Sequence, residues 1–223
     1  MVALALYDAL WKRCSMADLA NHIEEDLNWR EAELASFKIL VSAAQKGSVR
    51  ERALLRALWA LLYAHYEGFC KYAWDLYLDA LEELGIVRHA CRSRIACFSL
   101  EREFKQLRGN LSPESLWDFC TKEFPDLLSQ HATFQIKLET QSNLWPDLFR
   151  ENARKISLPT KMLDANEIRI KTLVARRNDI AHGKKTIVKS LHEYQEYENA
   201  VLLVMHELAI AMIEALDQKL FLK

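Results

Sequence analysis

"ALLRALWALLYA", residues 53–64, is apolar on every side of a helix except at Arg56. A helix that is hydrophobic all round lies inside a bundle, because none of its faces is suited to water. The chain continues into "HYEGFCKYAWDLY", residues 65–77, which is aromatic and partly polar. We therefore expect a central, buried helix from about residue 49 to 84, with the rest of the fold arranged around it.

Local signals mark where this central helix begins and ends. Gly47 interrupts the preceding helical pattern, and Ser48 with Glu51 forms an S-x-x-E capping box. Gly85 supplies the expected end. Before it, apolar residues recur at helical spacing and predict a long helix over about 16–45. They are Leu19, Ile23, Leu27, Leu34, Phe37 and Leu40.

Two more helices are expected near the C-terminus. Asp164 with Glu167 resembles another capping pair and would open a helix through "EIRIKTLVARRNDIA". Gly183 would end that helix in a left-handed conformation. A last amphipathic helix is expected over about 190–218.

Residues 86–162 carry weaker signals. Pro113 with Glu114 predicts a helix start, and Pro125 predicts a break. The segments "WPDLF" (145–149) and "SLPT" (157–160) are interpreted as connections. The sequence thus predicts an all-α fold: one domain over residues 1–223, a bundle of four to five long helices with short helices inserted in the middle.

Composition agrees with this class. Of 223 residues 51% are hydrophobic, and only five are Gly and four Pro, which argues against disorder and against turn-rich β folds. The cysteines, Cys14 among them, form no CxxC pair, so neither a zinc ribbon nor a disulfide framework is indicated. The N-terminus lacks a basic region and its apolar run stops at Asp8, which argues against a signal peptide. The apolar stretch 200–216 contains His206 and two glutamates and is expected to be a core helix. We expect a cytoplasmic protein without a membrane segment.

Charge is unevenly distributed. The net charge is −1, yet residues 150–189 hold 11 basic and 4 acidic residues, a net charge of +7 that leaves −8 for the remainder. Such a local field can attract phosphates. The alternative is a solvated surface that acidic residues elsewhere balance in three dimensions.

Several chemistries find no support in the sequence. No histidine has a glutamate three positions before it, as helical di-iron sites require, and no HExxH occurs. The glycines are isolated, so there is no glycine-rich phosphate loop. We therefore expect no metal and no cofactor.

The stretch "RRNDIAHG", residues 176–183, remains. It can be interpreted as a well-made helix end, because a histidine in the last turn suits the helix dipole and glycine stops the helix. It can also be interpreted as an Arg and a His placed together to act on a phosphate. The spacing Arg177-Asn178-x-x-x-His182 does not decide between the two.

Two segments together resemble a known family. "RRNDIAHG" resembles the R-x4–6-H motif of the HEPN superfamily, including the polar residue directly after the Arg. "LLRALWALLYAHYEGFCKYA" (54–73) is similar to the long-helix signature of a bacterial HEPN-like nuclease branch, and the order of helices also fits. The resemblance implies a bundle that dimerises and brings two motifs into one cleft. Arg177 and His182 match the catalytic pair of the family, and Asn178 matches its supporting polar residue.

The same resemblance implies a function. The protein is expected to be a metal-independent RNA endonuclease, a toxin or antiviral defence effector, that cuts RNA by 2′-hydroxyl attack as a homodimer. An antitoxin or another defence-system protein is a possible partner. Lys184 stands where some antitoxin-paired relatives carry a modified tyrosine, so that mode of regulation is not expected. The alternatives are a non-catalytic HEPN-like module that binds nucleotide, RNA or protein, and an unrelated oligomerisation protein.

Supporting residues are expected around the motif. Arg176 also lies at an allowed spacing from His182, and Asp179 is either a helper or half of a surface salt bridge. Glu67 and Lys71 either line the same cleft or form an i, i+4 pair beside a structural network that includes His65.

RNA-binding candidates are Lys184, Lys185, Arg92 and Arg94. The last two belong to "RHACRSR" (88–94), which either guides RNA to the cleft or is an ordinary solvated loop. Aromatic residues of the second anchor either stack on bases or belong to the core. They are Tyr63, Tyr66, Tyr72 and Trp74.

Overall fold

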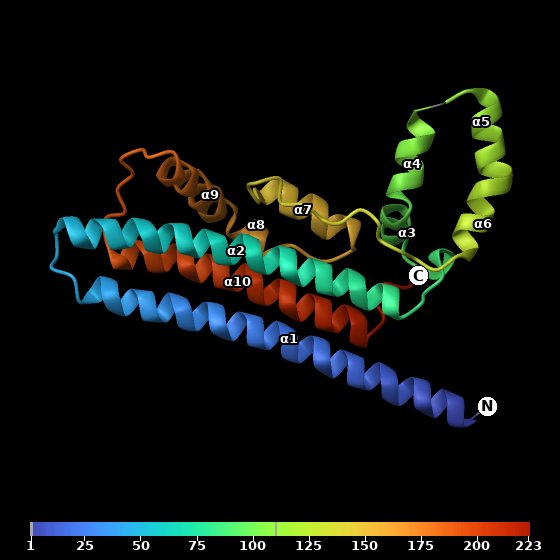
Figure 1. Cartoon of the computed structure of the whole chain (residues 1–223), viewed down its shortest axis with the longest axis horizontal. Coiled ribbons are helices and arrows are strands. Elements are labelled where there is room, and N and C mark those ends of the chain that lie inside the picture. The colour runs from blue at the N-terminus through green and yellow to red at the C-terminus, as the bar shows by residue number, and fades with distance from the viewer. Residues whose placement is uncertain (1, 110) are drawn as a thin grey trace.

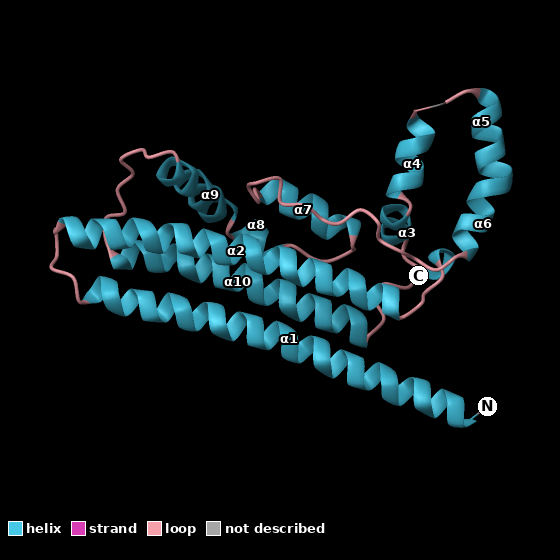
Figure 2. Cartoon of the chain, in the orientation of Figure 1, coloured by secondary structure: helices cyan, strands magenta, loops and turns pink. Residues whose placement is uncertain are grey.

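The computed structural model describes the backbone of residues 2–109 and 111–223 and the side chains of residues 18–109 and 111–223. Within these ranges every regular element is a helix, and only two isolated β-bridges occur (Figure 2). The helices are α1 (Val2–Ser42), α2 (Val49–Glu83), α3 (Ser93–Ser99), α4 (Glu101–Arg108), α5 (Pro113–Asp118), α6 (Phe124–Ser129), α7 (Pro146–Lys155), α8 (Lys161–Ala165), α9 (Glu167–Ala181) and α10 (Leu191–Asp217). The predicted all-α class is confirmed.

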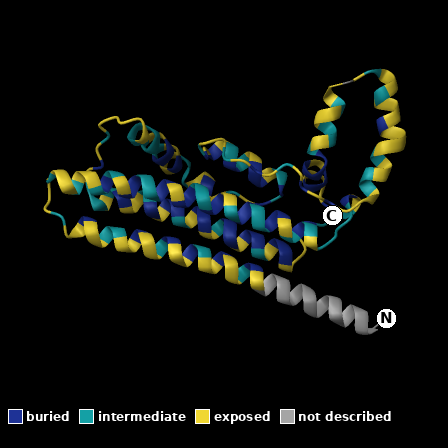
Figure 3. Cartoon of the chain, in the orientation of Figure 1, coloured by how far each residue is buried: buried dark blue, intermediate teal, exposed yellow. Residues whose placement is uncertain are grey.

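Three long helices form the body of the molecule. Helices α1, α2 and α10 run side by side, and the shorter α9 crosses over α2 and α10 (Figure 1). Helix α2 contacts all three of the others, and buried residues recur along its whole length (Figure 3). Three residues of segment 53–64 are completely buried: Leu58, Trp59 and Leu62. The expectation of a central helix is confirmed, but the helix is not buried on every side, because Ala53, Ala57 and Ala64 are exposed.

The ends of α2 follow from their residues. The Ser48 hydroxyl accepts the backbone N–H of Glu51 at 3.0 Å, as in a capping box. The Glu51 carboxylate reaches back one residue further than usual, to the N–H of Gly47 at 2.6 Å. Gly85, just beyond the end of α2, has a φ of +58°, which a residue without Cβ adopts at no steric cost.

Helix α10 carries the apolar stretch predicted to be a core helix. By length and composition it is the one helix in the described part of the chain that would suffice to cross a membrane. More than half of its most apolar window is nevertheless buried inside the protein, where it packs against α1, α2 and α8. In this structure α10 is therefore a helix of the hydrophobic core.

Three expectations about the segment between α2 and α9 are wrong. Pro125 does not break the chain direction: α5 runs through a π-helical turn (Phe119–Glu123) into α6, and the wider turn accommodates a residue that has no N–H. "WPDLF" is not a connection, because Pro146 opens α7 at a position where a helix tolerates proline. Asp164 lies inside α8 and does not cap α9, whose first residue is nevertheless Glu167.

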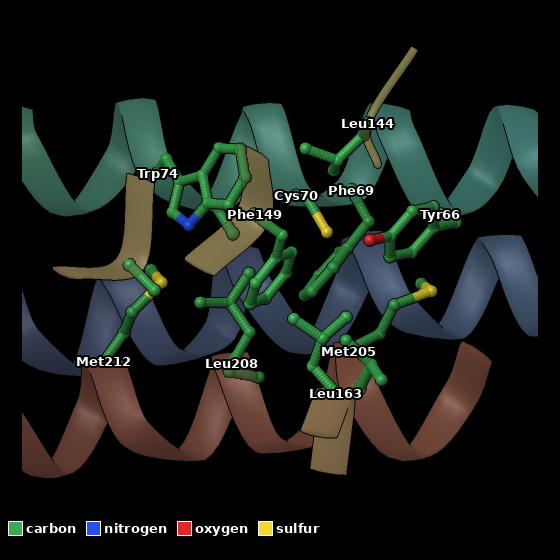
Figure 4. Close-up of a cluster of buried hydrophobic side chains, with 14 of the residues drawn as sticks. Tyr66, Phe69, Cys70, Trp74, Leu144, Phe149, Leu163, Met205, Leu208 and Met212 are labelled. Atoms are coloured by element: carbon green, nitrogen blue, oxygen red, sulfur yellow. The ribbon is translucent and has the colours of Figure 1, made fainter. Parts of the chain in front are cut away.

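Helix α7 joins this middle region to the bundle core. The Phe149 ring lies 5.3 Å from the Trp74 ring and 6.5 Å from the Tyr66 ring, measured between centroids (Figure 4). Leu208 and Met212 of α10 line the same cluster (Figure 4). The core of the middle region is thus continuous with that of the bundle.

Four cysteines of the described part of the chain, Cys70, Cys91, Cys97 and Cys120, are free thiols. Burial raises the pKa of Cys70 well above its ordinary value, which keeps that thiol protonated. Cys14 lies outside the residues whose side chains are described.

Candidate functional site

Arg177 is held by acceptors from three parts of the chain. Its Nη1 donates to the side-chain oxygens of Asn143 at 3.1 Å and Asn178 at 2.9 Å. Its Nη2 donates to the Glu67 carboxylate at 3.3 Å and to the Ser142 carbonyl at 3.4 Å. All four terminal N–H groups therefore have a protein acceptor, and the two contacts of Nη2 are the longer, weaker ones. The guanidinium orientation is fixed before any ligand arrives.

The ring of Tyr63 packs against the Arg177 guanidinium. The guanidinium carbon lies 3.9 Å from the centre of the Tyr63 ring, which is a cation–π contact. The Tyr63 hydroxyl accepts the backbone N–H of Leu144 at 2.8 Å, and burial raises the pKa of this tyrosine. The ring therefore anchors both the arginine and the turn that approaches it from the middle region.

That turn is a part of the site that the sequence did not disclose. Gln141 and Ser142 have φ values of +48° and +66°, a conformation that costs residues with a Cβ of order 1 kcal/mol each. The turn places the Ser142 carbonyl and the Asn143 amide against Arg177. No local pattern in "TQSNLW" indicates this contact, because it joins residues 34 positions apart.

Glu67 reaches the motif and Lys71 does not. The Glu67 carboxylate pairs with Arg177, while its Oε1 atom is buried without a partner among the described residues. Lys71 is exposed and makes no ion pair with Glu67, so the expected i, i+4 pair does not form. Of the two cleft candidates, only Glu67 lies beside the arginine.

His182 caps the C-terminal end of α9. Its backbone N–H donates to the Asn178 carbonyl at 2.9 Å, and Gly183 follows with a φ of +72°. The N–H of Lys184 bonds to the Asp179 carbonyl at 2.9 Å, which completes a Schellman motif. The helix-ending interpretation of the stretch is therefore correct as a description of the backbone.

The side chain of His182 is exposed and makes no hydrogen bond or ion pair with a described residue. Five positions separate it from Arg177, so the two side chains point roughly 140° apart around the helix axis. No hydrogen bond joins the two side chains within one chain. Any joint action on one phosphate needs a second copy of the motif or a change in shape.

The structure separates Arg176 from Arg177. Arg176 turns inward, pairs with Glu193 at 2.7 Å, and lies over the rings of Trp59 and Tyr197 at 5.0 and 5.7 Å. It ties α9 to α2 and α10. Asp179 forms a surface salt bridge with Lys184 at 2.7 Å, which is the simpler of the two roles considered for it.

The contact between Arg176 and Glu193 predicts a pH-dependent contribution to stability. Burial alone would raise the pKa of Glu193, but hydrogen bonds from Arg176 and from the backbone N–H of Lys189 outweigh it and lower that pKa. A lowered carboxyl pKa stabilises the fold above the unfolded value of about 4.3, and the gain is lost as pH falls through the folded value.

We expect Glu193→Gln to lower the free energy of unfolding at pH 7 by about 1 kcal/mol and to have a smaller effect near pH 3. Urea titrations at both pH values measure the difference. Glu196→Gln, on an exposed residue of the same helix, is the control. Equal destabilisation by Glu193→Gln at both pH values would contradict the linkage.

Ion pairs absorb much of the basic window. Six of its eleven cations pair with carboxylates, as the balanced-surface interpretation expects. They are Arg150, Lys155, Lys171, Arg176, Arg177 and Lys184. Lys185 is exposed and has no ion pair among the described residues. Near the motif, the unpaired positive charge is thus smaller than the sequence count suggests.

Arg92 and Arg94 do not border the motif. They lie at the start of α3, at the opposite end of the bundle from the C-terminal end of α9 (Figure 1). Within one chain the length of α2 separates this segment from the motif, so of the two alternatives the guidance of RNA to the cleft stays a prediction.

The aromatic residues of the second anchor belong mainly to the core. Tyr63, Tyr66 and Trp74 are at most 1% exposed, so they are not free to stack on bases. His65 is also buried, and its Nε2 lies 2.9 Å from the Glu33 carboxylate. Burial, and next the nearby Arg30, lower the pKa of His65. This network joins α1 to α2 and faces away from Arg177.

Residues 19–221 match the family model described as MAE_28990-like HEPN, which covers nearly the whole chain. No curated protein and no solved structure matches this chain significantly. The match confirms the HEPN resemblance noted in residues 54–73 and 176–183.

Proposed function

We propose that this chain, which belongs to the MAE_28990-like family of HEPN proteins, is a metal-independent RNA endonuclease. In this proposal two copies of the chain form a homodimer, and their Arg177 and His182 side chains meet in one cleft. The 2′-hydroxyl of RNA attacks the neighbouring phosphate, and the products carry a 2′,3′-cyclic phosphate and a 5′-hydroxyl.

The proposal rests on one observation, that the Arg177 guanidinium is fixed in place and still partly exposed. Its guanidinium is fixed by Tyr63, Glu67 and two asparagines, yet its side chain remains 23% exposed. A preorganised arginine stabilises phosphate charge without further ordering, because its planar fork matches two phosphate oxygens. The two contacts of Nη2, with Glu67 at 3.3 Å and with the Ser142 carbonyl at 3.4 Å, are the longest, and a phosphate oxygen would replace them.

His182 is assigned the proton transfers. An imidazole side chain can take the proton of the 2′-hydroxyl or give one to the leaving 5′-oxygen, the usual roles of histidine in general acid–base catalysis. One histidine cannot face both oxygens of an in-line displacement at once. Two copies supply a base and an acid, and this requirement supports the homodimer.

The wider role follows from the chemistry. An endonuclease that needs only RNA would be harmful in the cytoplasm unless it is controlled, so we assign it to toxin or antiviral defence activity. Its controlling partner would be an antitoxin or another protein of the defence system. Lys184 and Lys185, beside His182, are proposed to hold the RNA backbone.

The test is cleavage of total RNA by the purified protein in EDTA, with product ends determined by phosphatase and ligase treatment. Arg177→Lys should lower cleavage by about 10²-fold, because lysine keeps the charge but loses the bidentate fork. Arg169→Lys, on an exposed arginine of the same helix, should cleave like the wild type. Equal cleavage by Arg177→Lys and the wild type would remove the assignment of this residue.

The second candidate is a non-catalytic HEPN-like module that binds nucleotide, RNA or protein. The favouring observation is that all four terminal N–H groups of Arg177 already have protein acceptors, as in a structural arginine. This second candidate predicts no cleavage of any RNA at micromolar protein concentration. It also predicts that Arg177→Lys strongly lowers the free energy of unfolding.

A further inference from the structure

Two adjoining cavities lie at the end of the molecule away from Arg177. The first, of about 660 Å³, lies between the start of α3, the turn after α7 and the C-terminal residues. The second, of about 430 Å³, lies between α3, α4 and α7. Arg94 borders both cavities, so the two adjoin, and together they are called the groove below. Cavities of this size commonly hold small ligands.

Uncompensated arginines line this groove. Arg94, Arg108 and Arg154 are exposed and make no ion pair or hydrogen bond with a described residue. The first cavity has no acidic side chain in its lining. In the second, Glu101 pairs with Lys105 at 3.0 Å and Glu151 pairs with Lys155 at 3.3 Å, so each acid has a lysine partner and the arginines keep their charge. Free guanidinium groups in a concave surface are suited to phosphate.

Two aromatic side chains lie next to the arginines. Phe98 and Phe104 line the second cavity, and the Lys155 ammonium lies 5.5 Å from the centre of the Phe98 ring. Phe104 is only partly buried. A cationic surface beside an aromatic one offers a nucleotide two complementary contacts, one for its phosphate and one for its base.

We propose that this groove, defined by Arg92, Arg94, Phe104, Arg108 and Arg154, is a second binding site that takes a nucleotide phosphate. The ligand is either a free nucleotide or one unit of an RNA strand, and the two share the chemistry that the groove recognises. The site binds without cleaving and does not depend on the catalytic assignment of Arg177 and His182.

Two probes test the proposal on the full chain. Fluorescence anisotropy measures binding of labelled 2′-O-methyl hexauridylate, which lacks the attacking hydroxyl and cannot be cut, and calorimetry measures binding of ATP. Arg94→Ala and Arg154→Ala should each weaken binding about tenfold, as loss of a charge-assisted contact does. Arg102→Ala, on an exposed arginine of α4 outside the groove, should change binding less than about twofold.

Because the side chains of Arg94 and Arg154 are exposed and form no hydrogen bond or ion pair with a described residue, the thermal midpoint of both variants should equal that of the wild type. Binding of the oligonucleotide but not of ATP assigns the groove to an RNA strand, and the reverse assigns it to a free nucleotide. The proposal is overturned if neither probe binds, or if binding survives in Arg94→Ala and is lost in Arg177→Ala. A chain that binds through Arg94 yet cleaves nothing supports this site while the catalytic proposal fails.

Discussion

Replacement of His182 by alanine is expected to lower the rate of RNA cleavage by about 10²- to 10⁴-fold, the usual contribution of a positioned general acid or base. The fold should not change, because the side chain is exposed and bonds to no described residue. The capping bond of His182 to Asn178 uses the backbone N–H, which alanine keeps. A gel assay with a defined RNA in EDTA, beside thermal unfolding, measures both effects.

His192→Ala provides the matched control. This histidine is also exposed, lies near the start of α10, and should leave cleavage unchanged. Cleavage by His182→Ala at the wild-type rate would remove His182 from the catalytic site.

Mixtures of wild type and His182→Ala test whether two chains share one cleft. At equal amounts, random pairing leaves about one quarter of the dimers with both histidines. If base and acid come from different copies, activity should fall to about that fraction and not to one half. Activity proportional to the wild-type content would mean that each chain acts alone. That result fits poorly with a structure in which Arg177 and His182 of one chain point apart.

Local features of the sequence predicted the fold well. Ser48, Gly85 and Gly183 shape the chain within a few residues of themselves, so the helix ends they mark lie where expected. Pro125 was misread because its effect depends on the turn before it: a π-helical turn lets the helix continue. Proline forbids a regular α-helical turn, but it does not determine how the chain adapts.

The site was less accessible to sequence reasoning because it depends on contacts distant in sequence. Arg176 and Arg177 differ by one position, a rotation of about 100° that sends one toward Glu193 and the other toward Glu67. Glu67 was among the candidates, since it interrupts an aromatic helix face. Asn143 was not, because nothing near it in sequence indicates that its turn reaches α9. Such a contact is set by how α7 docks on the bundle.

That docking leads to the expected result that Phe149→Ala lowers the free energy of unfolding by about 3–5 kcal/mol, the usual cost of removing a buried phenyl ring. Phe149 is 2% exposed and packs against Trp74 and Tyr66 of α2 (Figure 4). Urea unfolding followed by tryptophan fluorescence and by circular dichroism measures the loss. Trp117→Ala, on a residue of α5 that is 69% exposed, should cost less than about 0.5 kcal/mol.

The same variant tests whether the middle region and the bundle unfold together. One hydrophobic cluster contains Phe149, Leu144 and the α2 residues, so both probes should report a single, shifted transition. The turn that holds Arg177 begins at Gln141, three residues before Leu144, and Leu144 ties it to Tyr63. Loosening α7 should therefore loosen the arginine and lower cleavage at temperatures where the protein is still folded. Two separate transitions, with cleavage unchanged below the second, would show that α7 is a dispensable attachment and that Arg177 is positioned by α2 and α9 alone.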